Sequence, residues 1–125
     1  MTCFWDGLLK KLKPNDFIKS LNVKHKPNCD EFVMLIKSNN IKTPNVKCND
    51  KTLTDQEIDD NIIRIKNIKN INKGYLCSSC DPVLILVSQL FSINIIHNFN
   101  GTEIKYINPH AKGQIYIRSD SDHLF

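Results

Sequence analysis

The feature that most restricts how this sequence can fold is an almost wholly apolar segment from Val83 to Ser92. Asp81 before it is a helix-capping residue, and Pro82 suits a first helical turn because its missing N–H would have no partner there. A helix that is apolar on nearly every side has to be surrounded by other elements. The segment therefore predicts a helix in the middle of the domain.

The hydrophobic pattern changes from a helical period to a strand period directly after this helix. Apolar and polar residues alternate in three segments, and Asn100-Gly101 is a turn signal between the first two. The segments run from Ile93 to Phe99, from Thr102 to Ile107 and from Gly113 to Arg118. Together they predict a small antiparallel sheet.

More helices are predicted before the central one. The clearest begins at Thr54, because Thr54 and Glu57 match a capping box and Leu53 and Ile58 match a hydrophobic staple. It is expected to end near Asn67, and the others are predicted from Cys3 to Leu12, from Asp16 to Leu21 and from Cys29 to Ser38, with residues 39–51 interpreted as a loop. The fold class is thus α+β, with N-terminal helices followed by a small antiparallel sheet.

The size and composition indicate a single globular domain over residues 1–125. No apolar run is long enough to cross a bilayer and no signal peptide is visible, so we expect a cytoplasmic protein, in the host cytoplasm if it is viral, without a membrane partner. The net charge of +4 comes from lysines scattered along the chain. We interpret them as a solvated surface, and expect a monomer that does not bind nucleic acid.

The cysteines are odd in number and no export signal accompanies them, which favours free, catalytic or metal-bound thiols over a disulfide framework. Cys3 stands at a predicted helix start, where the helix dipole favours the thiolate. A nucleophilic thiolate needs a histidine as general base, and the candidates are His25, His97, His110 and His123. We expect His97 to be a surface or partly buried strand residue. Residue types alone leave the choice of base open.

Four motifs follow one another along the chain. They are a helix opened by Cys3-Phe4-Trp5-Asp6-Gly7-Leu8, a connection with Tyr75-Leu76, an apolar helix running into a strand from Asp81 to Ile96, and a last strand that leads to His123-Leu-Phe125. This order resembles that of the ovarian-tumour (OTU) family of cysteine proteases, in its compact viral, papain-like type. The resemblance spans nearly the whole chain.

The resemblance implies an OTU-like thiol protease that needs no cofactor for catalysis. Cys3 would attack the carbonyl carbon, His123 would accept and return the proton, and backbone N–H groups near Thr2 and Cys3 would receive the oxyanion. The implied substrates are isopeptide or peptide bonds after the C-terminus of ubiquitin or ubiquitin-like proteins, and also a viral polyprotein. The acidic residues available to bind a basic ubiquitin tail are Asp30, Glu31, Asp55, Glu57, Asp59 and Asp60.

The chain departs from the family pattern at both ends. The family usually has a loop with Asp and Gly before the nucleophile, and its third catalytic residue often follows the histidine by two positions. Neither feature is present, so we expect a fragment truncated at both ends. Asp120 or Asp122 could orient His123 instead, although solvated turn residues are the favoured interpretation. His110 is the fallback base.

The other cysteines form a second candidate site. Cys77-Ser-Ser-Cys80 has the spacing of a zinc knuckle, and Cys29 and Cys48 could complete four thiolates around a structural zinc ion. The favoured alternative is that Cys77 and Cys80 are helix-start and packing residues. The second hypothesis for function is a noncatalytic module, zinc-stabilised or not, that binds protein or nucleic acid.

Overall fold

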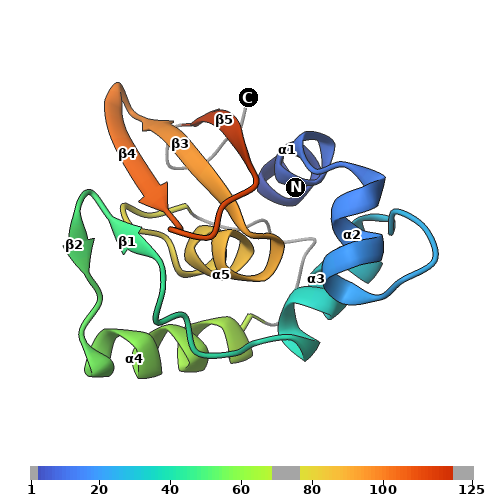
Figure 1. Ribbon diagram of the computed structural model, residues 1–125, viewed down its shortest axis with the longest axis horizontal. Helices are drawn as coiled ribbons and strands as arrows, with labels where there is room; N and C mark the ends of the chain where they lie inside the picture. The colour runs from blue at the N-terminus through green and yellow to red at the C-terminus, as the bar shows by residue number, and fades with distance from the viewer. Residues whose placement is uncertain (1–2, 69–76, 120–125) are drawn as a thin grey trace.

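The central helix predicted from the apolar segment is present. A computed structural model describes residues 3–68 and 77–119, and in it α5 (Pro82–Phe91) lies between the sheet and the remaining helices (Figure 1). The Asp81 carboxylate accepts a hydrogen bond from the Val83 N–H at 2.9 Å, and Pro82 occupies the first helical turn. Eight of the ten residues of α5 are buried, which confirms its predicted place.

The predicted helices before α5 are also present, although α2 begins at Pro14 and not at the predicted Asp16. Capping boxes mark the starts of two of them. Thr54 and Glu57 form the expected capping box, and Asn28 and Glu31 form a second one at the preceding helix. In each box a side-chain oxygen satisfies a backbone N–H that has no partner within the helix. The bounds are Cys3–Lys11 for α1, Pro14–Leu21 for α2, Cys29–Ser38 for α3 and Asp55–Lys66 for α4.

A chain of aromatic contacts packs the helices against one another. Trp5 of α1 contacts Phe32 of α3, Phe32 contacts Phe17 of α2, and Phe17 contacts Phe91 of α5, with ring centroids 5.9, 5.7 and 5.1 Å apart. All three pairs have edge-to-face geometry, which complements the positive edge of one ring with the negative face of the next. These rings tie α1, α2 and α3 to the central helix.

The sheet is mixed, not antiparallel as predicted. Its strand order is β2-β1-β4-β3-β5, and β5 pairs with β3 in parallel while β4 pairs with β3 antiparallel. The bounds are Lys47–Cys48 for β1, Lys51–Thr52 for β2, Ile93–Phe99 for β3, Thr102–Ile107 for β4 and Gly113–Ser119 for β5. The α+β class is correct, but the expected antiparallel pairing of the last strand is wrong.

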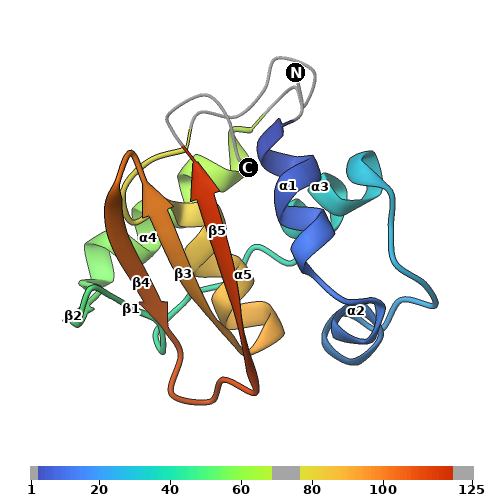
Figure 2. The same cartoon turned by 90° about the horizontal axis from the view of Figure 1, so that it is seen from above.

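The parallel pairing follows from where the chain passes between β4 and β5. The Asn108 amide donates to the Ser88 carbonyl at 2.9 Å, and the Lys112 N–H donates to the Ser92 carbonyl at 2.7 Å. These bonds hold the connection under the junction of α5 and β3, so that the chain emerges on the far side of β3 (Figure 2). The other edge of β4 is occupied by β1.

The hairpin of β1 and β2 lies within the stretch that was interpreted as a loop. Asn49 and Asp50 between its strands both have positive φ values, 51° and 66°, as a tight two-residue hairpin turn requires. Each strand has only two residues, so no alternation of apolar and polar residues could signal it. The hairpin extends the sheet along β4.

We expect the Phe17→Ala substitution to destabilise the protein by about 3 to 5 kcal/mol, because it leaves a cavity between α2, α3 and α5. Urea unfolding monitored by circular dichroism measures this change. The neighbouring Ile18 is 42% exposed, so Ile18→Ala should change the unfolding free energy by about 0.5 kcal/mol or less. Similar losses in the two variants would contradict the packing described here.

Candidate functional site

The first helix begins at the predicted nucleophile. α1 starts at Cys3, whose side chain lies outside the described residues, and buries Phe4, Trp5 and Leu8 in the core. The aromatic residues after Cys3 therefore belong to the core. Because this apolar face anchors the helix, the start of α1 has a fixed place relative to the sheet.

β5 lies beside α1 and runs in the opposite direction. Lys11, at the end of α1, lines the same groove as Lys112 and Gln114, near the start of β5. The start of α1 and the end of β5 accordingly lie at the same edge of the molecule (Figure 2). β5 ends at Ser119, and the predicted residues Thr2, Asp120, Asp122 and His123 lie outside the described residues.

The fallback base lies at the opposite edge. His110 is exposed in the connection between β4 and β5, and its backbone N–H donates to the Asn108 side chain at 2.9 Å. This connection precedes Gly113, whereas the end of β5 that neighbours the start of α1 is Ser119. The whole length of β5 therefore separates His110 from the edge where α1 begins.

A buried polar cluster joins β3, β5 and the residues before α5. The His97 Nε2 lies 2.6 Å from the Ser119 Oγ and 4.0 Å from the Cys77 Sγ. His97 has no exposed surface, so the expectation of a surface or partly buried histidine is wrong. The alternation of buried Ile93, Ile95 and His97 along one strand face was the signal that could have identified it.

This cluster is not suited to proton transfer or nucleophilic attack at neutral pH. Burial lowers the pKa of His97 to about 4, so the imidazole is neutral. Burial, together with the nearby Asp81 carboxylate, raises the pKa of the Cys77 thiol far above its usual range. The neutral imidazole, the protonated thiol and the hydroxyl therefore form a polar cluster whose role is structural, as is usual for polar groups inside a core.

Cys29 is the second free thiol of the described residues, and it is also unreactive. Partial burial is the main cause that raises its pKa to about 12, with additional contributions from a hydrogen bond to Asp6 and from the charges of Asp6 and Asp30. Negative charge next to a thiol disfavours the thiolate. Cys29 is thus protonated at physiological pH.

The four cysteines of the predicted zinc site are not brought together as thiolates. Cys48 of β1 forms a disulfide with Cys80, which precedes the cap of α5, so the expectation that cysteines here avoid disulfides is wrong for this pair. Cys29 and Cys77 are free. Within residues 3–68 and 77–119, no group of three or more His, Cys, Asp or Glu side chains is placed to hold a metal ion.

The acidic residues predicted to meet a basic substrate tail divide into two sets. Asp30 and Glu31 begin α3, which packs on α1, and Asp6 of α1 lies beside Cys29 of the same helix pair. Asp6 was not among the acidic residues predicted for this role. The other set lies on α4, which packs on α5 at a distance from α1 (Figure 1): Asp55, Glu57, Asp59 and Asp60.

Comparisons with protein-family models, with curated proteins and with solved structures found no match for this chain. Among the described residues, no helix has the length and apolar character needed to span a bilayer. The function therefore has to be inferred from the chain's own residues and their placement.

We expect the protein to lose stability between about pH 6.5 and pH 4 through His97. Its pKa is lower in the folded protein than in the unfolded chain, so the unfolded chain takes up a proton first as the pH falls. The stability present above pH 6.5 then decreases by about 3 kcal/mol. Urea unfolding at pH 7 and at pH 4.5 measures the change.

The control for this experiment is the exposed His110. His110→Gln should leave the difference between the two pH values as it is in the unsubstituted protein, whereas His97→Gln should reduce it. An equal pH dependence in all three proteins would mean that His97 is solvated.

We expect Cys48→Ala/Cys80→Ala to lower the unfolding free energy by about 3 to 4 kcal/mol, because the disulfide closes a loop across 32 positions of the chain. Mass spectrometry of a digest made without reductant should recover the two cysteines in one linked peptide pair. If both were alkylated before reduction, while the protein released zinc on denaturation, the zinc site would be favoured over the disulfide.

Proposed function

We propose that this chain carries a cysteine protease domain of the OTU-like type, with Cys3 as nucleophile and His123 as general base. The observation that carries the proposal is the antiparallel contact of α1 with β5. α1 begins at Cys3, and β5 ends four residues before His123. A fully extended chain covers about 14 Å over four residues, which is the greatest distance that can separate His123 from the end of β5.

The start of a well-anchored helix suits a nucleophilic thiol. The positive end of the helix dipole and the backbone N–H groups of the first turn favour the thiolate over the thiol. Such positions lower the pKa of a thiol from about 8.5 toward neutrality. α1 has nine residues and a buried apolar face, which support this role for Cys3.

The environments of the other four cysteines disfavour a thiolate, which supports Cys3 as the nucleophile. Cys48 and Cys80 are joined to each other, Cys77 is buried with a raised pKa, and Cys29 has a pKa of about 12. Each environment disfavours a thiolate at pH 7. A thiol-dependent reaction in this domain would consequently depend on Cys3.

The reaction proposed is hydrolysis of an isopeptide or peptide bond. The Cys3 thiolate adds to the carbonyl carbon, and backbone N–H groups near Thr2 and Cys3 receive the oxyanion. His123 donates a proton to the departing amine, which leaves a thioester on Cys3. Water, deprotonated by His123, then cleaves the thioester and restores the thiol. Asp120 or Asp122 is proposed to orient the His123 ring.

The substrates proposed are conjugates of ubiquitin or a ubiquitin-like protein, or a viral polyprotein. The electrostatics near α1 support a basic substrate segment, because the carboxylates of Asp6 and Asp30 both lie close to Cys29, where α1 packs on α3. Carboxylates at the rim of a binding site attract and orient cationic side chains. The rival function is a noncatalytic binding module, which would not require a reactive thiol at Cys3.

Labelling with an electrophile attached to the C-terminus of ubiquitin tests the proposal. The chain should form a covalent adduct detectable by mass spectrometry. The Cys3→Ala variant should form none, and His123→Ala should form it at a rate lower by about 100-fold or more, because the thiolate loses its partner.

Matched controls are available for both residues. Cys29→Ala removes a protonated thiol and His110→Ala removes a histidine at the opposite edge of β5, so both variants should react as fast as the unsubstituted chain. An adduct on Cys29 or Cys77, or labelling that survives in Cys3→Ala, would assign the nucleophile elsewhere. No adduct with ubiquitin or ubiquitin-like probes, in a folded chain, would favour the binding module.

A further inference from the structure

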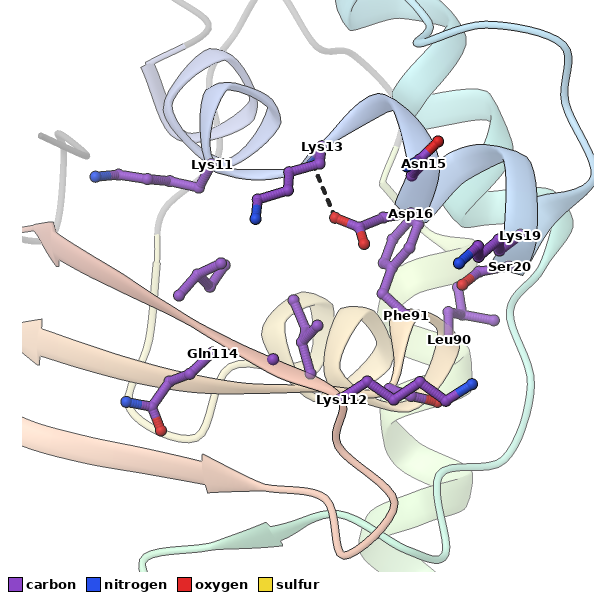
Figure 3. Close-up of a pocket in the computed structure, with 14 residues that line it drawn as sticks. Lys11, Lys13, Asn15, Asp16, Lys19, Ser20, Leu90, Phe91, Lys112 and Gln114 are labelled. Atoms are coloured by element: carbon purple, nitrogen blue, oxygen red, sulfur yellow. Dashed lines mark hydrogen bonds between the residues drawn. The ribbon is translucent and has the colours of Figure 1, made fainter.

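A basic groove lies between the start of α2, the end of α5 and the turn before β5 (Figure 3). Its volume is about 440 Å³. Four exposed lysines line it: Lys11, Lys13 and Lys19 from the first two helices and their junction, and Lys112 from the distant turn before β5. The groove lies at the end of the sheet opposite to the proposed catalytic edge.

The positive charge of this groove is poorly balanced. Asp16 supplies the single carboxylate among the lining residues, and it accepts a hydrogen bond from the Lys13 backbone N–H at 2.8 Å as the cap of α2. Within the described part of the chain, the ion pairs are Lys42 with Asp59 and Lys105 with Glu103. None of the groove lysines takes part in them.

The walls of the groove are fixed to one core, so the backbone positions that carry the lysines are held close together. The Phe17–Phe91 contact, with centroids 5.1 Å apart, holds α2 on α5. The hydrogen bond of 2.7 Å from the Lys112 N–H to the Ser92 carbonyl holds the turn on the end of α5. A bound anion would relieve the repulsion between the lysines, and would therefore bind favourably.

The floor of the groove adds an apolar surface. Leu90 and Ile115 are half-buried there, and the amide side chains of Asn15 and Gln114 lie at its rim. A single nucleic-acid strand presents one phosphate charge at each nucleotide and bases with apolar faces and hydrogen-bonding edges. We propose that this groove binds single-stranded nucleic acid, with phosphates against the lysines and a base against Leu90 and Ile115. The proposal does not depend on the protease activity.

Fluorescence anisotropy with a labelled oligothymidylate of about 12 nucleotides tests this proposal. Lys13→Gln/Lys112→Gln should weaken binding about tenfold at about 50 mM salt, and should reduce the slope of log K against log salt by about 1.4, for the loss of two phosphate contacts. Lys47→Gln/Lys66→Gln has the same net charge, and both of its lysines are exposed outside the groove. This control should change the affinity by less than about twofold.

Three outcomes would overturn the proposal. Absence of binding at about 50 mM salt would mean that the groove takes no nucleic acid. Equal weakening in the two double variants would mean that only the overall charge matters. Competition by polyglutamate at the same concentration of charge, as effective as competition by unlabelled oligothymidylate, would assign the groove to an acidic peptide instead.

Discussion

The burial of α5 is the constraint on which the rest of the structure depends. The helix is apolar on nearly all sides, and α2, α3, α4, β3 and β4 all pack against it. Its buried polar residue, Ser88, donates to the Ile93 carbonyl at 2.7 Å, and the Ser88 carbonyl accepts from Asn108. These bonds matter because an unsatisfied polar group in such a place would cost about 1 to 3 kcal/mol. They also fix the chain that connects β4 to β5, and through it the place of β5 beside α1.

Local signals in the sequence predicted most of the elements. The caps at Asn28, Thr54 and Asp81 are complete within four residues, so the helix starts they indicate could be identified without knowledge of the fold. The parallel pairing of β5 could not be identified in this way. It depends on hydrogen bonds that Asn108 and Lys112 make with the end of α5. The residues that accept these bonds lie about 20 positions earlier in the chain, so no local pattern reveals them. A short connection between two strands is usually a hairpin, and here the hydrogen bonds under β3 override that preference.

The candidate sites depend even more on distant residues. The helix start at Cys3 was predictable, because spacing alone places Phe4 and Leu8 on one face. The disulfide of Cys48 with Cys80 was not, since it requires β1 to lie beside the residues before α5. The basic groove was hidden for the same reason, because only the fold brings Lys112 beside Lys11, Lys13 and Lys19.

The contact of α1 with β5 joins the earliest of the described elements in the chain with the latest one. Until β5 emerges, one edge of β3 has no neighbour, and α1 has no strand to lie against. Contacts between such distant parts of a chain form late in folding, because the intervening chain must first be ordered. The edge that begins with Cys3 can therefore be completed only when synthesis of the domain is nearly finished.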